Sequence, residues 1–92
     1  MDKLAKIVVR KDVRFLESKK EAGKKIPVID LVISTGLDDF LVTAFDTVAS
    51  RIIAEDLNVG AICLFSLNFS VSGNQEDKYK FQSIRLTNYA KV

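Results

Sequence analysis

Residues 41–61, LVTAFDTVASRIIAEDLNVGA, decide the fold, because two alternating runs enclose one helical run. The β-branched and aromatic residues from Phe40 to Asp46 are typical of a strand, and Asp46 is suited to cap the helix that follows. Between Thr47 and Leu57, apolar residues recur at helical spacing. They are Val48, Ala49, Ile52, Ile53 and Leu57. Gly60 lies near the expected helix end. The stretch therefore predicts strand, helix and strand.

Period-two alternation predicts three further strands around this stretch. With the two that enclose the helix, the five are Leu4–Phe15, Ile26–Ser34, Phe40–Asp46, Ala61–Ser72 and Tyr79–Tyr89. In the first, Ala5, Ile7, Val9, Val13 and Phe15 form the expected core face, and Lys11 interrupts it where a bulge is plausible. In the last, Tyr79, Phe81, Ser83, Arg85, Thr87 and Tyr89 share one face. The chain is expected to be all-β with one short helix.

The 92 residues fit a single domain, residues 1–92, of ordinary globular composition with 48% hydrophobic residues. So small a core is marginal, and a homo-oligomer, a dimer or tetramer, is expected. The longest nearly apolar run, 59–67, is too short to span a membrane, and the charged N-terminus does not suit a signal peptide. A cytoplasmic location is expected. Cys63, the one cysteine, is expected to be a buried apolar residue.

Charge is distributed unevenly, although the net charge is only +2. Residues 1–25 hold nine Lys or Arg against four Asp or Glu, residues 26–77 hold one against eight, and residues 78–92 hold four against none. If the fold brings both basic ends to one side, the surface can steer an anion. Ordinary solvated charge is the alternative.

Five strands with the helix between the third and fourth follow the order of a five-stranded oligonucleotide/oligosaccharide-binding (OB) Greek-key barrel. Four stretches carry a closer likeness: AGKKIPVIDLVIST, LVTAFDTVAS, DLNVGAICLFSLNFSVS and GNQEDKYKFQSIRL. Together they resemble the OB domain of bacterial and phage single-stranded DNA-binding proteins and, less closely, primosomal replication protein B. The resemblance implies binding of single strands in replication, recombination or repair.

The chain also departs from that family. It has no Trp, and Asp39 and Asn74 stand where the family commonly has stacking Trp residues. The connection between the second and third strands is short, and Asn68, Ser70 and Ser72 stand where basic residues are usual. We expect lower affinity per subunit. The chain ends at Val92 without an acidic C-terminal tip, so the partner recruitment that the tip serves in the family is not expected.

Single strands bind to basic grooves and to aromatic faces that stack on bases. The resemblance places Phe45 where the family's third-strand Phe meets a base, although a strand Phe can equally be core. Tyr79, Phe81 and Arg85 suit stacking beside a phosphate, or else an oligomer interface. The remaining candidates are basic residues of the first strand, the first loop and the last hairpin. They are Lys6, Arg10, Arg14, Lys19, Lys20, Lys24, Lys25, Lys78 and Lys80. A solubilising loop is the alternative for the lysines.

No enzyme is expected, because the chain has no His and its carboxylates suit turns and the helix surface. Asp38, Asp39 and Asp46 suit turn and cap positions better than a metal site, and we expect no metal, cofactor or small-molecule substrate. The sequence predicts a protein that binds single-stranded DNA without sequence specificity. The alternatives are RNA as ligand and an oligomeric OB-fold adaptor that binds proteins.

Overall fold

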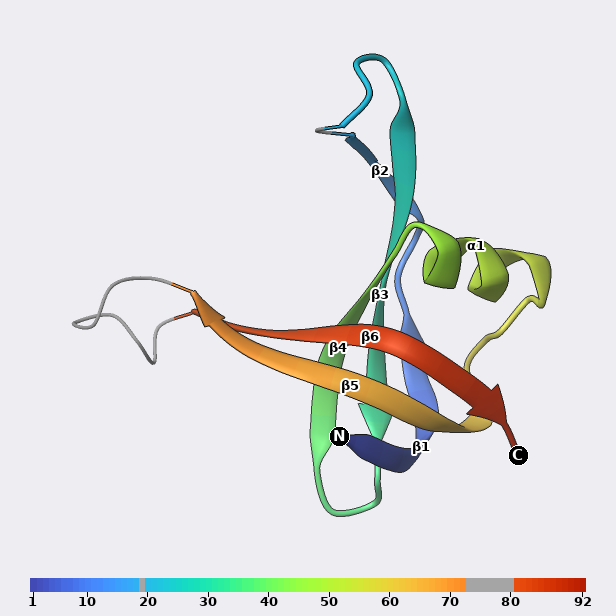
Figure 1. Ribbon diagram of the computed structural model, residues 1–92. Coiled ribbons are helices and arrows are strands. Elements are labelled where there is room, and N and C mark those ends of the chain that lie inside the picture. Colours follow the sequence, from blue (N-terminus) through green and yellow to red (C-terminus); the bar gives the residue numbers. More distant parts are fainter. Residues whose placement is uncertain (19, 73–80) are drawn as a thin grey trace.

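The computed structural model describes residues 1–18, 20–72 and 81–92, with the side chains of 70–72 and 81–83 outside that description. Six strands and one helix follow each other along the chain (Figure 1). They are β1 (Asp2–Arg10), β2 (Arg14–Glu17), β3 (Lys25–Ser34), β4 (Asp39–Phe45), α1 (Thr47–Ala54), β5 (Ile62–Ser72) and β6 (Phe81–Lys91). The prediction of a mostly β chain with one short helix in this place is confirmed.

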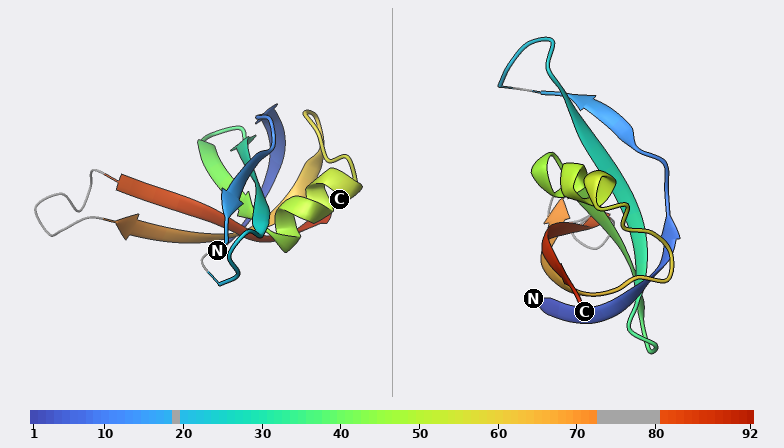
Figure 2. Two further views of the ribbon diagram at one scale, coloured as in Figure 1. Left: turned by 90° about the horizontal axis from the view of Figure 1, so that it is seen from above. Right: turned by 90° about the vertical axis from the view of Figure 1, so that its right-hand side faces the viewer.

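The strands form one sheet that closes on itself. Its order is β1-β5-β6-β4-β3-β2, and β1 also pairs with β3, so five strands form a ring that is visible end-on at the right of Figure 2. The β4–β6 pairing is parallel and the others are antiparallel. β2 and the first part of β3 project from the ring as a two-stranded ribbon, and β5 and β6 project as a second arm (Figure 1).

The expected first strand is divided into β1 and β2. The first half of β1 pairs with β5 and the second half with β3, and the register shifts between Ile7 and Val9. Such a bulge transfers the following residues to the opposite face. Val9 is consequently 43% exposed, and Phe15, on the projecting ribbon, is 61% exposed. The prediction that both belong to the core face is wrong.

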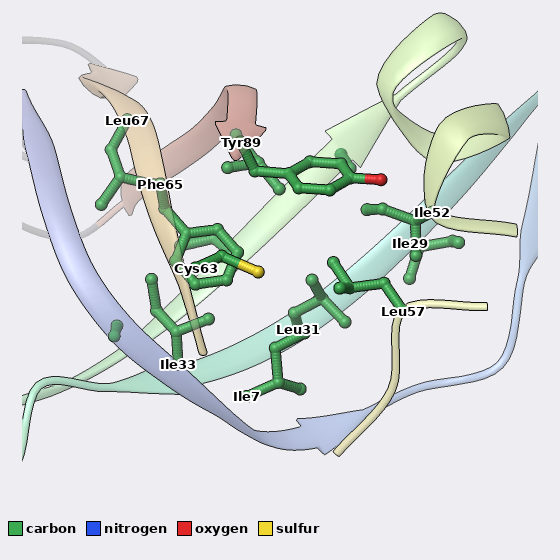
Figure 3. Packing of buried hydrophobic residues seen from close by; sticks show 14 of the residues in the cluster. Ile7, Ile29, Leu31, Ile33, Ile52, Leu57, Cys63, Phe65, Leu67 and Tyr89 are labelled. Carbon is green, nitrogen blue, oxygen red and sulfur yellow. The ribbon is translucent and has the colours of Figure 1, made fainter. Parts of the chain in front are cut away.

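The core fills the ring and continues under α1 (Figure 3). Its fully buried larger side chains come from β1, β3, β4, β5, β6 and the helix region. They include Ile7, Ile29, Leu31, Ile33, Val42, Ile52, Leu57, Phe65 and Leu86. Cys63 is buried among them, as expected, and burial raises the pKa of its thiol.

A second bulge changes the predicted face of Tyr89. The β5–β6 register shifts between Ser66 and Leu67, which leaves Thr87 as an extra residue in β6. Tyr89 therefore points into the core with 3% exposure, while Arg85 stays exposed on the outer face. The prediction that Tyr89 and Arg85 share a face is wrong.

The helix is shorter than predicted. It ends at Ala54, and of the expected apolar stripe Ala49, Ile52 and Leu57 are buried whereas Ile53 is 43% exposed. Asp46 precedes the first turn at φ 52°, but its carboxylate makes no capping hydrogen bond. The expected capping role of this carboxylate is wrong.

The end of the helix is formed by Asp56 rather than Gly60. Asp56 has φ 49°, and its amide donates to the carbonyl of Ile53 while the Leu57 amide donates to that of Ile52. This is a Schellman motif with Asp at the left-handed position that usually takes Gly. Gly60, at φ 97°, instead turns the chain so that its amide donates to the carbonyl of Ile7.

In the part of the chain that the structure describes, no helix has the length and apolarity needed to cross a membrane. Within the same residues, no three Cys, Asp or Glu side chains gather as metal ligands.

Candidate nucleic-acid interface

The outer face of the sheet beside the projecting ribbon carries the candidate site. Strand pairing places Arg14 of β2, Val28 of β3 and Phe45 of β4 in one row across this face. Val28 is fully buried although it lies outside the main core cluster. We infer that its neighbours on the outer face cover it. Phe45 is half-buried, so part of its ring remains accessible.

The adjacent row holds two charged side chains. Asp30 of β3 pairs with Thr43 of β4, and Thr43 pairs with Arg85 of β6. Because residues two apart along a strand point the same way, this row lies on the same face as the row of Phe45. Outer-face residues of four strands therefore stand side by side.

Phe45 and Arg85 form the centre of the site. The guanidinium carbon of Arg85 lies 5.0 Å from the centroid of the Phe45 ring, within cation–π range. The pair joins a flat apolar surface to a guanidinium cation. Aromatic rings and guanidinium planes are the groups on which unpaired bases stack.

Two hollows adjoin this pair. The larger, of about 550 Å³, opens toward the ribbon and is lined by Leu16, Glu17, Ser18, Lys20, Ile26, Phe45, Asp46 and Arg85. The smaller, of about 300 Å³, opens toward α1 and is lined by Phe45, Asp46, Thr47, Val48, Asn68, Arg85, Leu86 and Thr87. Lys20, from the basic N-terminal segment, thus shares a hollow with Arg85, from the basic C-terminal segment.

Arg14 is held by Asp30 on the same face. Its Nε donates to Asp30 Oδ2 at 3.2 Å and its terminal nitrogen to Oδ1 at 3.5 Å, while the Thr43 hydroxyl donates to Oδ1 at 2.7 Å. Partial burial alone would raise the pKa of Asp30, but the hydrogen bonds from Thr43 and Arg14 outweigh it and lower the pKa. The carboxylate therefore remains ionised beside the candidate site.

The three basic residues predicted on one face of the first strand do not share a face. The bulge after Ile7 separates Arg10 from the other two: Lys6 and Arg14 pair with Ser34 and Val28, which share the outer face of β3, whereas Arg10 pairs with the core residue Leu31. The Arg10 guanidinium donates to the Leu57 carbonyl at 3.0 Å and to Asp56 Oδ1 at 3.4 Å, which fastens β1 to the end of the helix. The shared face is a wrong prediction.

Three of the other predicted contacts belong to the described part of the ribbon and its turn. Lys20, Lys24 and Lys25 are exposed, and Lys25 is paired in register with Glu17. Four of the predicted contacts, Lys19, Lys78, Tyr79 and Lys80, lie outside the described residues, and Phe81 begins β6 with its side chain outside the description.

Sequence reasoning missed several residues of the site. Asp30 and Thr43 alternate on the outer face of their strands, and Asp46 and Asn68 line hollows. The alternation could have placed Asp30, Thr43 and Phe45 on exposed faces. It could not show that two strands would bring Asp30 to Arg14.

Comparison with known proteins identifies the fold. No protein-family model matches the sequence, and no curated protein matches it either. Among solved structures, the second OB-fold domain of replication protein A from Methanococcus maripaludis is similar, with a TM-score of 0.72 at 15% identity over 99% of this chain and 81% of that one. The protein PriB from Ralstonia solanacearum is similar with a TM-score of 0.59 at 12% identity, over 99% of this chain and 94% of that one. The chain has the OB fold that these two proteins share.

Proposed function

We propose that this chain is a non-enzymatic, cytoplasmic protein that binds single-stranded DNA in replication, recombination or repair with little sequence preference. The observation that carries the proposal is the stack of Arg85 on Phe45 between two hollows of the outer face. A base can stack on the ring or on the guanidinium, and the guanidinium can also meet a phosphate. Neither contact depends on base identity.

The charges around the pair support a polyanionic ligand. Lys20 lines the same hollow as Arg85, and Lys24 and Lys25 are exposed at the outer end of the ribbon, beside its turn. A strand that leaves the Phe45 ring toward the ribbon would pass these cations. The similar structures, a replication protein A domain and PriB, are consistent with a role in replication.

Fluorescence anisotropy with a labelled oligo-dT at two salt concentrations tests the proposal. The logarithm of the binding constant should fall with the logarithm of the salt concentration at a slope of about −0.7 per phosphate neutralised. The same measurement with oligo-U distinguishes RNA from DNA. No binding to either at low salt rejects a nucleic-acid function.

Charge reversal localises the contact. Lys24→Glu combined with Lys25→Glu should weaken binding by at least tenfold and make the slope shallower by about 1.4, the value for two phosphates. The matched control reverses Lys3 and Lys91, which lie on β1 and β6 where these strands flank β5, away from the ribbon. An equal loss in the control would mean that net charge alone governs binding.

A second candidate function is that of an oligomeric adaptor for proteins. An exposed apolar patch favours the oligomer that this function requires. Leu4, Leu64 and Ala90 lie in one row across β1, β5 and β6, with Ile62 beside them. Leu4, Ile62 and Leu64 are 58%, 49% and 43% exposed. We propose that a second copy of the chain covers this patch, since a domain of this size gains stability from association. Light scattering of Leu4→Glu and Leu64→Glu tests it: both variants should be monomeric while the unchanged chain is not.

A further inference from the structure

The Arg14–Asp30 pair has the form of an occupied anion site. Asp30 receives three hydrogen bonds, two from the Arg14 guanidinium and one from the Thr43 hydroxyl. Planar bidentate contact of this type is how guanidinium groups also hold phosphate. The donors that a phosphate would need are therefore present, and a carboxylate of the chain itself occupies them.

The pair is open enough to exchange partners. The Arg14 side chain is 50% exposed and that of Asp30 is 19% exposed. An ion pair that is partly open to solvent is weak. The Asp30 carboxylate is fixed to β3, whereas a phosphate of a single strand can approach Arg14 from solvent. Because the Arg14 side chain is half exposed, it can leave Asp30, whose carboxylate then keeps the hydrogen bond from Thr43.

The position of the pair connects it to the candidate site. Arg14 stands in the row of Phe45, with Val28 between them, and Asp30 stands in the row of Arg85, with Thr43 between them. A strand whose base meets Phe45 therefore passes next to the guanidinium of Arg14. It also meets the negative charge of Asp30 at close range.

We propose that Asp30 is an internal competitor for the phosphate subsite at Arg14, so that its carboxylate keeps the guanidinium from the phosphates of a bound single strand. Thr43 is a positioning residue, because its hydroxyl fixes the carboxylate where Arg14 reaches it. The inference rests on the proposed single-strand binding and adds to it. Asp30 limits affinity by keeping Arg14 out of the salt-dependent contact.

Asp30→Asn tests the competition by anisotropy with labelled oligo-dT. The amide keeps the shape and can still accept from Thr43, but it no longer pairs with the guanidinium as an anion. Binding at low salt should tighten five- to tenfold, and the salt slope should steepen by about 0.7, as for one more phosphate contact. Asp2→Asn is the control, since it removes one negative charge from an exposed strand position on β1, paired in register with Ser66 and away from the ribbon. It should change affinity by less than about twofold, without the steeper slope.

The double variant Arg14→Gln, Asp30→Asn tests whether the gain in affinity depends on Arg14. It should lose the gain in affinity and the steeper slope, because both require a free Arg14. Melting curves check that the variants fold, and Asp30→Thr, which removes the charge and suits a strand, replaces the amide if that variant is unfolded.

Each outcome decides the inference. If Asp30→Asn behaves like Asp2→Asn, or if the double variant keeps the gain, the inference is wrong while single-strand binding stands. If neither the unchanged chain nor Asp30→Asn binds oligo-dT at low salt, both the inference and the proposed function fail.

Discussion

In the part of the chain that the structure describes, two arginines lie over aromatic rings, and the two pairs have different surroundings. The guanidinium carbon of Arg51 is 4.5 Å from the centroid of Tyr89, and that of Arg85 is 5.0 Å from the centroid of Phe45. The first pair joins the helix to the ring of strands, and the second stands between two hollows. Nearly equal distances therefore accompany very different surroundings.

The two pairs differ in how many of their polar groups already have hydrogen-bond partners. Arg51 donates to Asn88 and to the Tyr89 carbonyl, and the Tyr89 hydroxyl donates to Glu55 at 2.8 Å. Among the residues that the structure describes, the side chain of Arg85 has no hydrogen-bond partner, and it lies over the Phe45 ring. A cation–π pair whose polar groups are satisfied stabilises the fold, whereas one whose donors face a hollow can bind a ligand.

Truncating the two rings should separate these roles most clearly. Tyr89→Ala should lower the free energy of unfolding by about 3–5 kcal/mol, because it empties a buried aromatic site. Phe45→Ala should cost about 1 kcal/mol or less in stability but weaken oligo-dT binding by about 1–3 kcal/mol, the value of one base stack. Urea unfolding followed by circular dichroism, together with anisotropy, measures both. If Phe45→Ala is as destabilising as Tyr89→Ala, Phe45 is a core residue and has no binding role.

Alkaline pH should affect only the structural pair. Burial, together with the hydrogen bond to Glu55, raises the pKa of Tyr89 to about 12 from its ordinary value of 10. The folded state thus favours the neutral phenol, so its contribution is complete below pH 10 and is lost as pH rises from 10 to 12. The loss should reach the order of 2 kcal/mol. Urea midpoints at pH 9 and pH 11.5 measure it.

Tyr89→Phe is the control for this pH dependence. Loss of the hydrogen bond to Glu55 should lower its free energy of unfolding by about 1 kcal/mol at neutral pH. Its urea midpoint should fall less between pH 9 and pH 11.5 than that of the unchanged chain. An equal fall in both proteins would assign the alkaline loss to other groups.

The comparison also shows what the sequence could predict. Alternation and helical spacing placed the strands and the helix to within a few residues, because these periods follow from which side chains face the core. Phe45 was identified by resemblance and lies on an outer face. Alternation fails where a bulge changes the period, and the bulges after Ile7 and at Thr87 are why Val9 and Tyr89 were assigned to the wrong faces.

The periodicity of the sequence does not show which strands pair or in which register. Arg10 was predicted to contact phosphate, yet it binds the end of the helix, 46 and 47 residues away along the chain. Arg14 was predicted on the same grounds and is held by Asp30. A basic residue in a strand can serve either role, and only the register of the neighbouring strand decides which.

Neutralising Arg85 should affect binding and neutralising Arg51 should affect stability, each to a moderate degree. Arg85→Gln should weaken oligo-dT binding five- to tenfold and make the salt slope shallower by about 0.7, with little change in melting temperature. Arg51→Gln should lower stability by about 1 kcal/mol through its lost hydrogen bonds and leave binding within about twofold. Each variant is the control for the other. If Arg51→Gln weakens binding as much as Arg85→Gln, the strand contacts the helix side as well.

The smallest effect should come from Asp56, which ends the helix on the structural side of the comparison. Its backbone is left-handed at φ 49°, a conformation that costs Asp more than Gly. Asp56→Gly removes the ion pair with Arg10, but that carboxylate is 87% exposed and the pair contributes little.

Asp56→Gly should therefore leave the free energy of unfolding unchanged or raise it by up to about 0.5 kcal/mol. Ala54→Gly, two residues earlier and still helical, is the matched control and should lower it by about 0.5–1 kcal/mol. If both changes destabilise the chain equally, the Arg10–Asp56 ion pair outweighs the backbone strain. Arg10 would then depend on its carboxylate partner as much as on the Leu57 carbonyl to hold β1 against the helix.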